Sequence, residues 1–191
     1  RSSGDSLVTA KRTPGGSNRA QHAVMVWREQ TVPVIAAIHG VAFGGGFQLA
    51  LGADIRFVTP DVKMAVLEIK WGLVPDMAGL VLMKRLVRDD VARELTYTGR
   101  IFTGEEALQL GFATRVCEDP RAEARALAAE ISGKNPHAIR GAKRLLDLAP
   151  DATQAEILMA ESKEQTALIG SPNQVEAVMS NMQKRPAVYV D

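Results

Sequence analysis

The sequence has one cysteine, few aromatic residues and almost no net charge. Cys117 is the only cysteine among 191 residues, so no intrachain disulfide is available, and we expect a cytoplasmic protein. The formal net charge is +1, and Phe, Trp and Tyr make up 5% of the residues. Nucleic-acid-binding surfaces combine clustered basic residues with aromatic ones, so we expect no nucleic-acid partner.

Long hydrophobic runs are also missing. No uninterrupted apolar stretch approaches the roughly 20 residues that cross a bilayer, so we expect no membrane-spanning segment. The first residues, RSSGDSLVTAKRTPGG, lack the apolar region of a signal peptide. The hydrophobic content of 46% is ordinary for a globular protein with a buried core.

Short apolar segments alternate with helical patterns up to Pro120, and only helical patterns follow. This order predicts an α/β core, assigned to residues 1–132, and a helical region, assigned to residues 133–191. The expected strands are residues 34–38, 54–59, 62–66 and 112–117. The expected helices of the core are residues 17–30, a short helix from the glycines at 44–46 to about Gly52, 76–86, 90–97 and 104–110.

Three consecutive glycines lie in VIAAIHGVAFGGGFQLALGAD, residues 34–54, between a strand pattern and a helix pattern. Backbone N–H groups at a helix N-terminus favour anions, and glycine lets a ligand approach them closely. The spacing does not match GxGxxG, because Leu49 stands where a glycine is needed, and no Gly-Lys-Ser/Thr of a P-loop follows. Two interpretations remain: a backbone donor for a developing oxyanion, or close packing of strand and helix.

Two carboxylates flank a turn further along the chain, in MAVLEIKWGLVPDMAG, residues 64–79. Glu68 stands among apolar residues, and a carboxylate buried in such surroundings is a candidate proton carrier. The alternative for Glu68 is a surface position on a short loop. Asp76 precedes a helix pattern, so it either caps that helix or faces the same pocket.

Four stretches together resemble the enoyl-CoA hydratase/isomerase family, which has the crotonase fold. They are PVIAAIHGVAFGGGFQLALGADIRF, LEIKWGLVPDMAGL, LTYTGRIFTGEEALQLGFATRV and SPNQVEAVMSNMQKRPAVYV, in order from about Val32 to the C-terminus. The resemblance implies an α/β fold, a crotonase-like spiral of ββα units. It also implies that the C-terminal helices build a homotrimer or a hexamer.

Members of this family bind acyl-CoA thioesters and stabilise an enolate on the thioester oxygen with two backbone N–H groups. By resemblance, one N–H belongs to Gly45, in the middle of the triplet. The other belongs to Asp5 in SSGDSL, where Ser6 replaces the family's Asp. A family-typical stretch of strands is expected before Arg1, outside this sequence. No metal and no redox cofactor is implied, because coenzyme A is part of the substrate.

Gln48 departs from the family pattern. Hydratases of the family carry two glutamates, and here Gln48 stands at the first position and Glu68 at the second. Glutamine can orient a group through hydrogen bonds but cannot exchange a proton at neutral pH. Asp76 stands where dienoyl-CoA isomerases of the family carry an Asp, although these enzymes have an acid at the position of Gln48. We therefore expect an isomerase in which Glu68, alone or with Asp76, moves a proton to shift a C=C bond.

Three other functions remain open: an enoyl-CoA hydratase, another reaction of the same enolate such as hydrolysis or retro-Claisen cleavage, and a non-catalytic acyl-CoA binder. Further substrate contacts are expected from three residues. Trp71 and Met77 either line the acyl pocket or pack in the core. Lys184 either reaches the CoA phosphates of a neighbouring subunit, as basic residues there do in the family, or lies solvated at a helix end.

Overall fold

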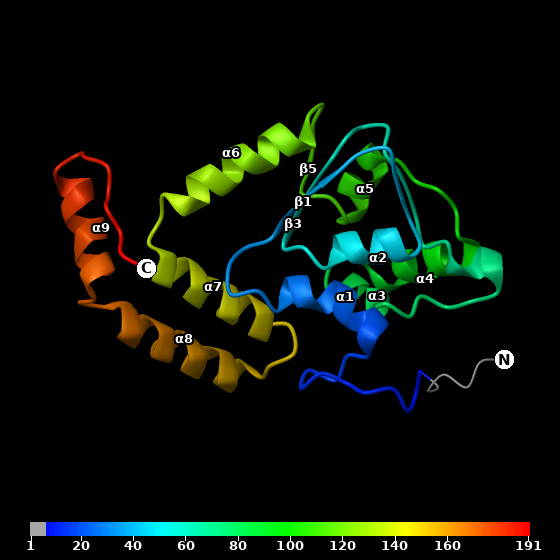
Figure 1. The fold of residues 1–191 in the computed structure, drawn as a ribbon, viewed down its shortest axis with the longest axis horizontal. Helices are drawn as coiled ribbons and strands as arrows, with labels where there is room; N and C mark the ends of the chain where they lie inside the picture. Colours follow the sequence, from blue (N-terminus) through cyan, green and yellow to red (C-terminus); the bar gives the residue numbers. More distant parts are fainter. Residues whose placement is uncertain (1–6) are drawn as a thin grey trace. The chain divides into compact units, whose positions relative to one another are not determined.

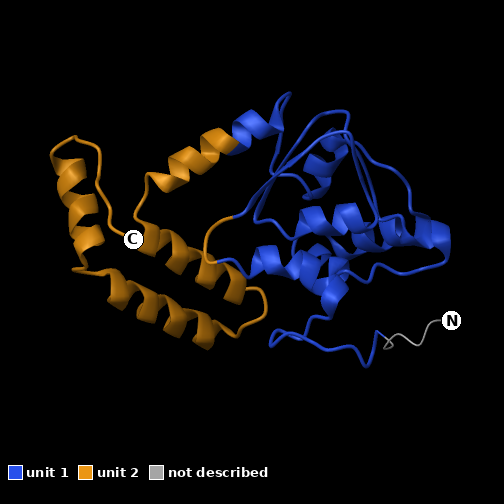
Figure 2. Cartoon of the chain, viewed as in Figure 1, with its two compact units in different colours: residues 1–30, 34–124 blue, residues 31–33, 125–191 orange. Residues whose placement is uncertain are grey.

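The computed structural model describes residues 7–191, so Asp5 lies outside the described residues. The chain divides into two compact units (Figure 2). One unit takes in residues 34–124 and the described residues before 31, and the other takes in residues 31–33 and 125–191. The division falls within the helix α6 (Pro120–Ser132), whereas the sequence suggested a boundary after residue 132.

Parallel strands form the centre of the first unit. β1 (Ile35–Ile38), β3 (Ile55–Val58) and β5 (Arg115–Val116) form a parallel sheet in the order β1-β3-β5. β2 (Val41–Phe43) pairs in parallel with β4 (Lys63–Ala65). β1, β3, β4 and β5 lie within the four predicted strand segments, whereas β2 was not expected. In Figure 1, β1 and β3 run side by side, and their register sets Ile35 opposite Ile55.

The helices of this unit connect and cover the strands. They are α1 (Arg19–Arg28), α2 (Gly45–Leu51), the 3₁₀ helix η1 (Glu68–Trp71), α3 (Gly79–Met83), α4 (Asp89–Thr98) and α5 (Gly104–Leu110). Asn18 caps α1 in a capping box with Gln21. Thr103 caps α5 by accepting from the Glu106 N–H, and the Glu106 carboxylate pairs with Arg100 at 2.7 Å.

The helix predicted over residues 76–86 is shorter than expected and begins later. Its α-helical part, α3, starts at Gly79, and its N-cap position is held by Ala78 in the left-handed conformation, with φ 67°. The prediction that Asp76 caps this helix is therefore wrong. A residue in the left-handed region cannot belong to a right-handed α-helix. The helix therefore cannot extend from Gly79 back to Asp76.

The few aromatic residues concentrate in the core. Phe47 of α2 lies 5.7 Å from Phe102 and 5.1 Å from Phe112, measured between ring centroids, and Phe102 lies 5.6 Å from Phe112. All three side chains are buried. Edge-to-face contacts of this kind add to the energy of burial, so the cluster fixes α2 against the segments that carry Phe102 and Phe112.

A buried arginine ties β3 to its neighbours. Arg56 donates from Nε to the Phe112 carbonyl and from Nη1 to the Ala53 carbonyl, both at 2.6 Å. Burial, with a smaller contribution from Arg28, lowers the pKa of Arg56 to about 10, while Asp54 raises it. The guanidinium therefore satisfies two carbonyls at a cost in solvation energy.

The second unit consists of most of α6 together with α7 (Pro136–Leu148), α8 (Gln154–Leu168) and α9 (Pro172–Met182). α7 packs along α8, and a bidentate ion pair joins Arg144 to Glu164. After α9 the chain turns back. The Asn173 side chain exchanges two hydrogen bonds with the backbone of Val190.

Candidate functional site

The glycine triplet forms the turn from β2 into α2. Gly44 holds φ 50° and ψ −118°, and its N–H donates to the Ala65 carbonyl of β4 at 3.0 Å. A Cβ on Gly44 would lie 3.2 Å from Glu68 Oε1. Both the backbone conformation and the close approach of a carboxylate therefore favour glycine at this position.

Gly45 is the first residue of α2 and is half-buried. Its N–H is one of the helix N-terminal donors, and no described residue accepts a hydrogen bond from it. A Cβ on Gly45 would lie 3.0 Å from the Met77 Sδ, so Met77 covers this side of the turn. The turn thus offers a free backbone donor beside an apolar side chain.

Gln48 lies one helical turn further on and is buried, with 1% of its surface exposed. Its Oε1 accepts from the Met77 N–H at 2.8 Å and from the Gly79 N–H at 2.9 Å. Its Nε2 donates to Glu68 Oε1 at 2.7 Å. One side chain therefore joins α2 to the first residue of η1 and to the start of α3.

Glu68 is the first residue of η1 and is half-buried. One carboxylate oxygen takes the hydrogen bond from Gln48. The other, Oε2, is buried and has no hydrogen-bond partner among residues 7–191. A buried acceptor without a protein partner is available to a ligand or to water.

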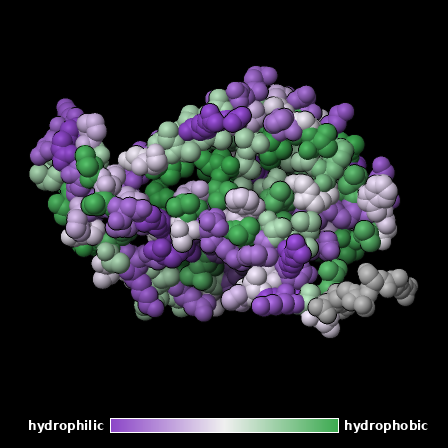
Figure 3. Space-filling view, in the orientation of Figure 1, coloured by the Kyte–Doolittle hydropathy of each residue, from purple (hydrophilic) through white to green (hydrophobic). Residues whose placement is uncertain are grey.

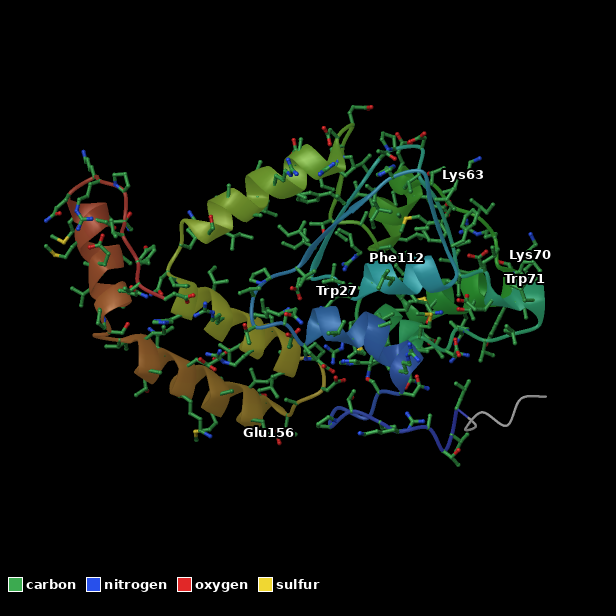
Figure 4. The ribbon with its side chains drawn as sticks, viewed as in Figure 1. Trp27, Lys63, Lys70, Trp71, Phe112 and Glu156 are labelled. Carbon is green, nitrogen blue, oxygen red and sulfur yellow. The ribbon has the colours of Figure 1, made fainter. Side chains whose placement is uncertain are left out.

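Asp76 and Trp71 are exposed rather than enclosed. The Asp76 side chain lies on the segment between η1 and α3. Trp71 is 70% exposed, and the Lys70 Nζ lies 5.5 Å from the centre of its ring. Figure 4 shows Lys70 and Trp71 together at the edge of their unit, away from Phe112 in the core. The alternative that Trp71 packs in the core is therefore wrong.

A cavity of about 480 Å³ lies between residues 74–75, α3 and α4. Its lining includes Val74, Leu80 of α3, Met83 and Tyr97 of α4. A second cavity of about 430 Å³ borders the glycine turn, between α1, β1 and α2, and its lining includes Gly46. The first has the size and mainly apolar lining of a small-molecule pocket, although neither Glu68 nor Gln48 lines it.

Lys184 follows α9 and is exposed, with φ 53°. Its neighbour Arg185 forms a bidentate ion pair with Glu176, which holds the pKa of that carboxyl at about 2; the Val188 N–H contributes to this shift. The tail after α9 is thus fixed to the helix by charge-assisted hydrogen bonds.

The described part of the chain contains neither a metal-ligand cluster nor a membrane-spanning helix. No group of three or more His, Cys, Asp or Glu side chains is arranged to hold a metal ion within residues 7–191. No helix in the same range is both long and apolar enough to cross a membrane. Figure 3 shows hydrophobic and hydrophilic side chains mixed on the visible surface.

The sequence patterns identified Gly45, Gln48, Glu68 and Met77 as candidates, and the structure brings these four together. Sequence reasoning missed that the Gln48 oxygen accepts from two N–H groups at the start of α3. The available signal was a single amide in the otherwise apolar stretch FQLAL, because a buried polar side chain requires partners.

Comparison with known proteins gives consistent matches along the chain. Residues 13–191 match the family Enoyl-CoA hydratase/isomerase. The mitochondrial Delta(3,5)-Delta(2,4)-dienoyl-CoA isomerase of Mus musculus is 34% identical over 157 residues, which are 80% of this chain and 48% of the mouse protein. The carnitinyl-CoA dehydratase of Escherichia coli O157:H7 is 31% identical over 163 residues, 82% of this chain and 62% of that protein.

Solved structures show the same fold. An enoyl-CoA hydratase from Polaromonas sp. JS666 superposes with a TM-score of 0.85 at 26% identity, over 90% of this chain and 67% of the other. One from Bacillus anthracis gives a TM-score of 0.82 at 28% identity, over 92% and 72%. The chain spans only 48% to 62% of the length of the two curated relatives described above. From the match over residues 13–191 and the shared crotonase fold, the chain belongs to the enoyl-CoA hydratase/isomerase family.

Proposed function

We propose that this protein binds an acyl-CoA thioester and shifts a C=C bond in the acyl chain by proton transfer through a thioester enolate. The observation that carries the proposal is the environment of Glu68. One oxygen is held by Gln48, and the other is buried without a partner beside the glycine turn. A carboxylate in this state has a free lone pair for a carbon-bound proton of the substrate.

In the proposed reaction, Glu68 Oε2 removes a proton from C2 of a 3-enoyl-CoA. The electron pair moves onto the thioester oxygen, which accepts a hydrogen bond from the Gly45 N–H. The proton then returns from Glu68 to C4, which gives a 2-enoyl-CoA without gain or loss of atoms. A backbone donor at such an oxyanion lowers the barrier by about 3 kcal/mol.

Other residues have supporting roles in the proposal. Asp76 is the candidate for a second carboxylate, and its exposure would let it exchange protons with water. Met77 and Trp71 are assigned to the acyl chain, Asp5 to the second oxyanion N–H, and Lys184 to the CoA phosphates. Coenzyme A enters with the substrate, and no other cofactor is part of the proposal.

Hydration of a 2-enoyl-CoA is the second candidate. It is favoured by relatives whose names describe hydratases and a carnitinyl-CoA dehydratase. Against it stands Gln48, which occupies one side of Glu68 and cannot transfer a proton to or from water. We therefore rank isomerisation above hydration.

We also propose assembly into a homotrimer or a dimer of trimers through the helices after residue 132. The support is a set of apolar side chains that the second unit leaves exposed to solvent. They include Leu158, Met159, Val175, Val178 and Met182, each between 46% and 75% exposed. Several exposed apolar side chains on one group of helices are consistent with an interface between subunits.

The test uses the full gene product with a 3-enoyl-CoA in heavy water, and chromatography with mass spectrometry follows the products. We expect a 2-enoyl-CoA without added water, with deuterium incorporated at C4 to the extent that the carboxylate exchanges with solvent. Glu68→Gln should abolish turnover and keep acyl-CoA binding. Glu118→Gln makes the same change at an exposed loop position and should leave turnover unchanged.

Other products would contradict the proposal in distinct ways. A 3-hydroxyacyl-CoA as the main product would establish hydration. Release of free CoA or of a shortened acyl chain would establish another reaction of the enolate. Binding without turnover, equal in the parent and in Glu68→Gln, would establish a non-catalytic acyl-CoA binder.

A further inference from the structure

The orientation of the Gln48 amide is determined by the backbone of α3. Its oxygen faces two N–H donors, those of Met77 and Gly79, at 2.8 and 2.9 Å. A flipped amide would place its NH₂ group against these donors and would lose both hydrogen bonds. The NH₂ group must therefore point in the opposite direction, where it meets Glu68 Oε1 at 2.7 Å.

This orientation determines how Glu68 can use its two carboxylate oxygens. An amide NH₂ group can donate but cannot accept, so Glu68 Oε1 can take part in the contact only as an acceptor. Hydrogen bonds to the charged form of a carboxyl favour that form. The contact also leaves Oε2, which is buried and has no partner among the described residues, as the oxygen free to receive a proton.

The space around the amide leaves little room for another arrangement. A Cβ on Gly79 would lie 2.7 Å from Gln48 Oε1 and 2.9 Å from its Cγ. A Cβ on Gly44 would lie 3.2 Å from Glu68 Oε1. Because Gly44 and Gly79 have no side chain, the side chains of Glu68 and Gln48 can lie this close to the backbone at these two positions.

We propose that Gln48 is a positioning residue that acts through Glu68: the N–H groups at the start of α3 fix its amide, and the amide engages Glu68 Oε1 as an acceptor and leaves Oε2 as the free oxygen of the base. This inference rests on the proposed role of Glu68 as the base. It adds that the conformation of residues 77–79 determines which Glu68 oxygen is free, although Glu68 lies on a different element.

The other charged groups on the elements around Glu68 are exposed or paired elsewhere. Lys70 of η1 lies over Trp71, and Asp76 is exposed. α4 packs against η1, and its charged side chains form ion pairs. These pairs are Arg88–Asp90, Arg93–Asp89 and Arg100–Glu94. Among the described side chains, the donor to the Glu68 carboxylate is therefore Gln48.

The decisive variant is Gln48→Glu, which keeps the shape of the side chain. A carboxylate at position 48 still accepts from the two backbone N–H groups, and these favour its ionised form. Its second oxygen then faces Glu68 Oε1 at the present 2.7 Å. Two carboxylates at this distance share one proton, and that proton resides on Glu68, which then cannot act as a base.

The expected result is a change in the pH profile of isomerisation. In Gln48→Glu, the pH at which kcat is half-maximal should rise by about one to three units, with KM within about threefold of the parent. Gln154→Glu introduces the same charge at the exposed first residue of α8 and should leave the profile unchanged. Gln48→Met removes all three hydrogen bonds and should lower kcat at every pH.

A purely structural role of Gln48 predicts a different outcome. Gln48→Glu retains both hydrogen bonds to the backbone, so its pH profile would coincide with that of the parent, and this result would overturn the proposal. A second readout does not depend on turnover. The carboxyl carbon of Glu68, labelled with ¹³C and assigned with Glu68→Gln, reports its ionisation directly by NMR.

The NMR titration separates the two hypotheses. If the protein does not isomerise 3-enoyl-CoA but the Glu68 signal titrates at higher pH in Gln48→Glu, the proposed function fails and the positioning role stands. If the signal titrates at the same pH in the parent and in Gln48→Glu, the positioning role fails, whatever reaction the protein catalyses.

Discussion

Gly79→Ala is the substitution with the most clearly defined effect on the site. Gly79 is buried, and its Cβ would lie 2.7, 2.9 and 3.0 Å from Oε1, Cγ and Cδ of Gln48. Real Cβ contacts are longer than this, so the Gln48 side chain must move. It cannot move without weakening its hydrogen bonds to Met77, Gly79 and Glu68.

The expected loss of stability follows from these contacts. Overpacking a buried position costs about 1–3 kcal/mol, and each weakened hydrogen bond costs about 0.5–1.5 kcal/mol. The higher helix propensity of alanine returns at most about 1 kcal/mol. We expect Gly79→Ala to lower the free energy of unfolding by about 1–3 kcal/mol and to reduce kcat at least tenfold, because Glu68 loses its donor.

Urea denaturation followed by circular dichroism measures the first effect, and the isomerisation assay measures the second. Gly46→Ala is the matched control, since nothing lies within 4 Å of its Cβ in α2 and the change should stabilise the helix by about 0.5–1 kcal/mol. In a Gln48→Ala background the clash is absent, so Gly79→Ala should cost less than about 0.5 kcal/mol there. An equal cost of Gly79→Ala in both backgrounds would refute the assigned clash.

Three further predictions follow from particular contacts. Ala78→Gly should raise the free energy of unfolding by about 0.5–1 kcal/mol, because it relieves a left-handed backbone at φ 67°; an unchanged or lower denaturation midpoint would contradict this. Arg56→Met should lower the free energy of unfolding by about 2–4 kcal/mol, since it leaves two buried carbonyls without a donor; thermal and urea unfolding would show it, and a change below about 0.5 kcal/mol would argue against the role of Arg56. Glu176 has its pKa lowered to about 2 by Arg185 and the Val188 N–H, so its stabilising contribution is complete above its ordinary value of 4.5 and is lost as the pH falls through about 2. The protection factors of the backbone amides at residues 184–190 should therefore decrease as the pH falls from 4.5 to about 2, and protection factors that do not change with pH would contradict the assignment.

Local patterns in the sequence determined most of the secondary structure. The strands at residues 35–38, 55–58 and 63–65 and the helices after Pro120 lie where apolar runs, caps and breaks predicted them. Asn18 and Thr103 acted through contacts within a few residues, which a sequence records directly. The family was likewise recognisable from the order and spacing of its motifs.

The start of α3 could not be predicted from local sequence patterns. Asp76 had the side chain of a helix cap, but the N–H of Gly79 donates to Gln48, which is 31 positions away in the sequence. Ala78, directly before this contact, has the left-handed conformation, and Asp76 is exposed. Nothing in the local residue pattern distinguishes a helix capped by its own side chains from one capped by a distant amide.

The sequence by itself determined the fold class, the family, and the residue types of the candidate site: glycines, one amide and one carboxylate. Only the tertiary structure decided how they act on one another. It turned the Gln48 oxygen towards α3 and its NH₂ group towards Glu68, and it left one Glu68 oxygen buried without a described partner. The physical reason is that a hydrogen bond depends on the direction of donor and acceptor, and that direction is set by the packing of α2, η1 and α3.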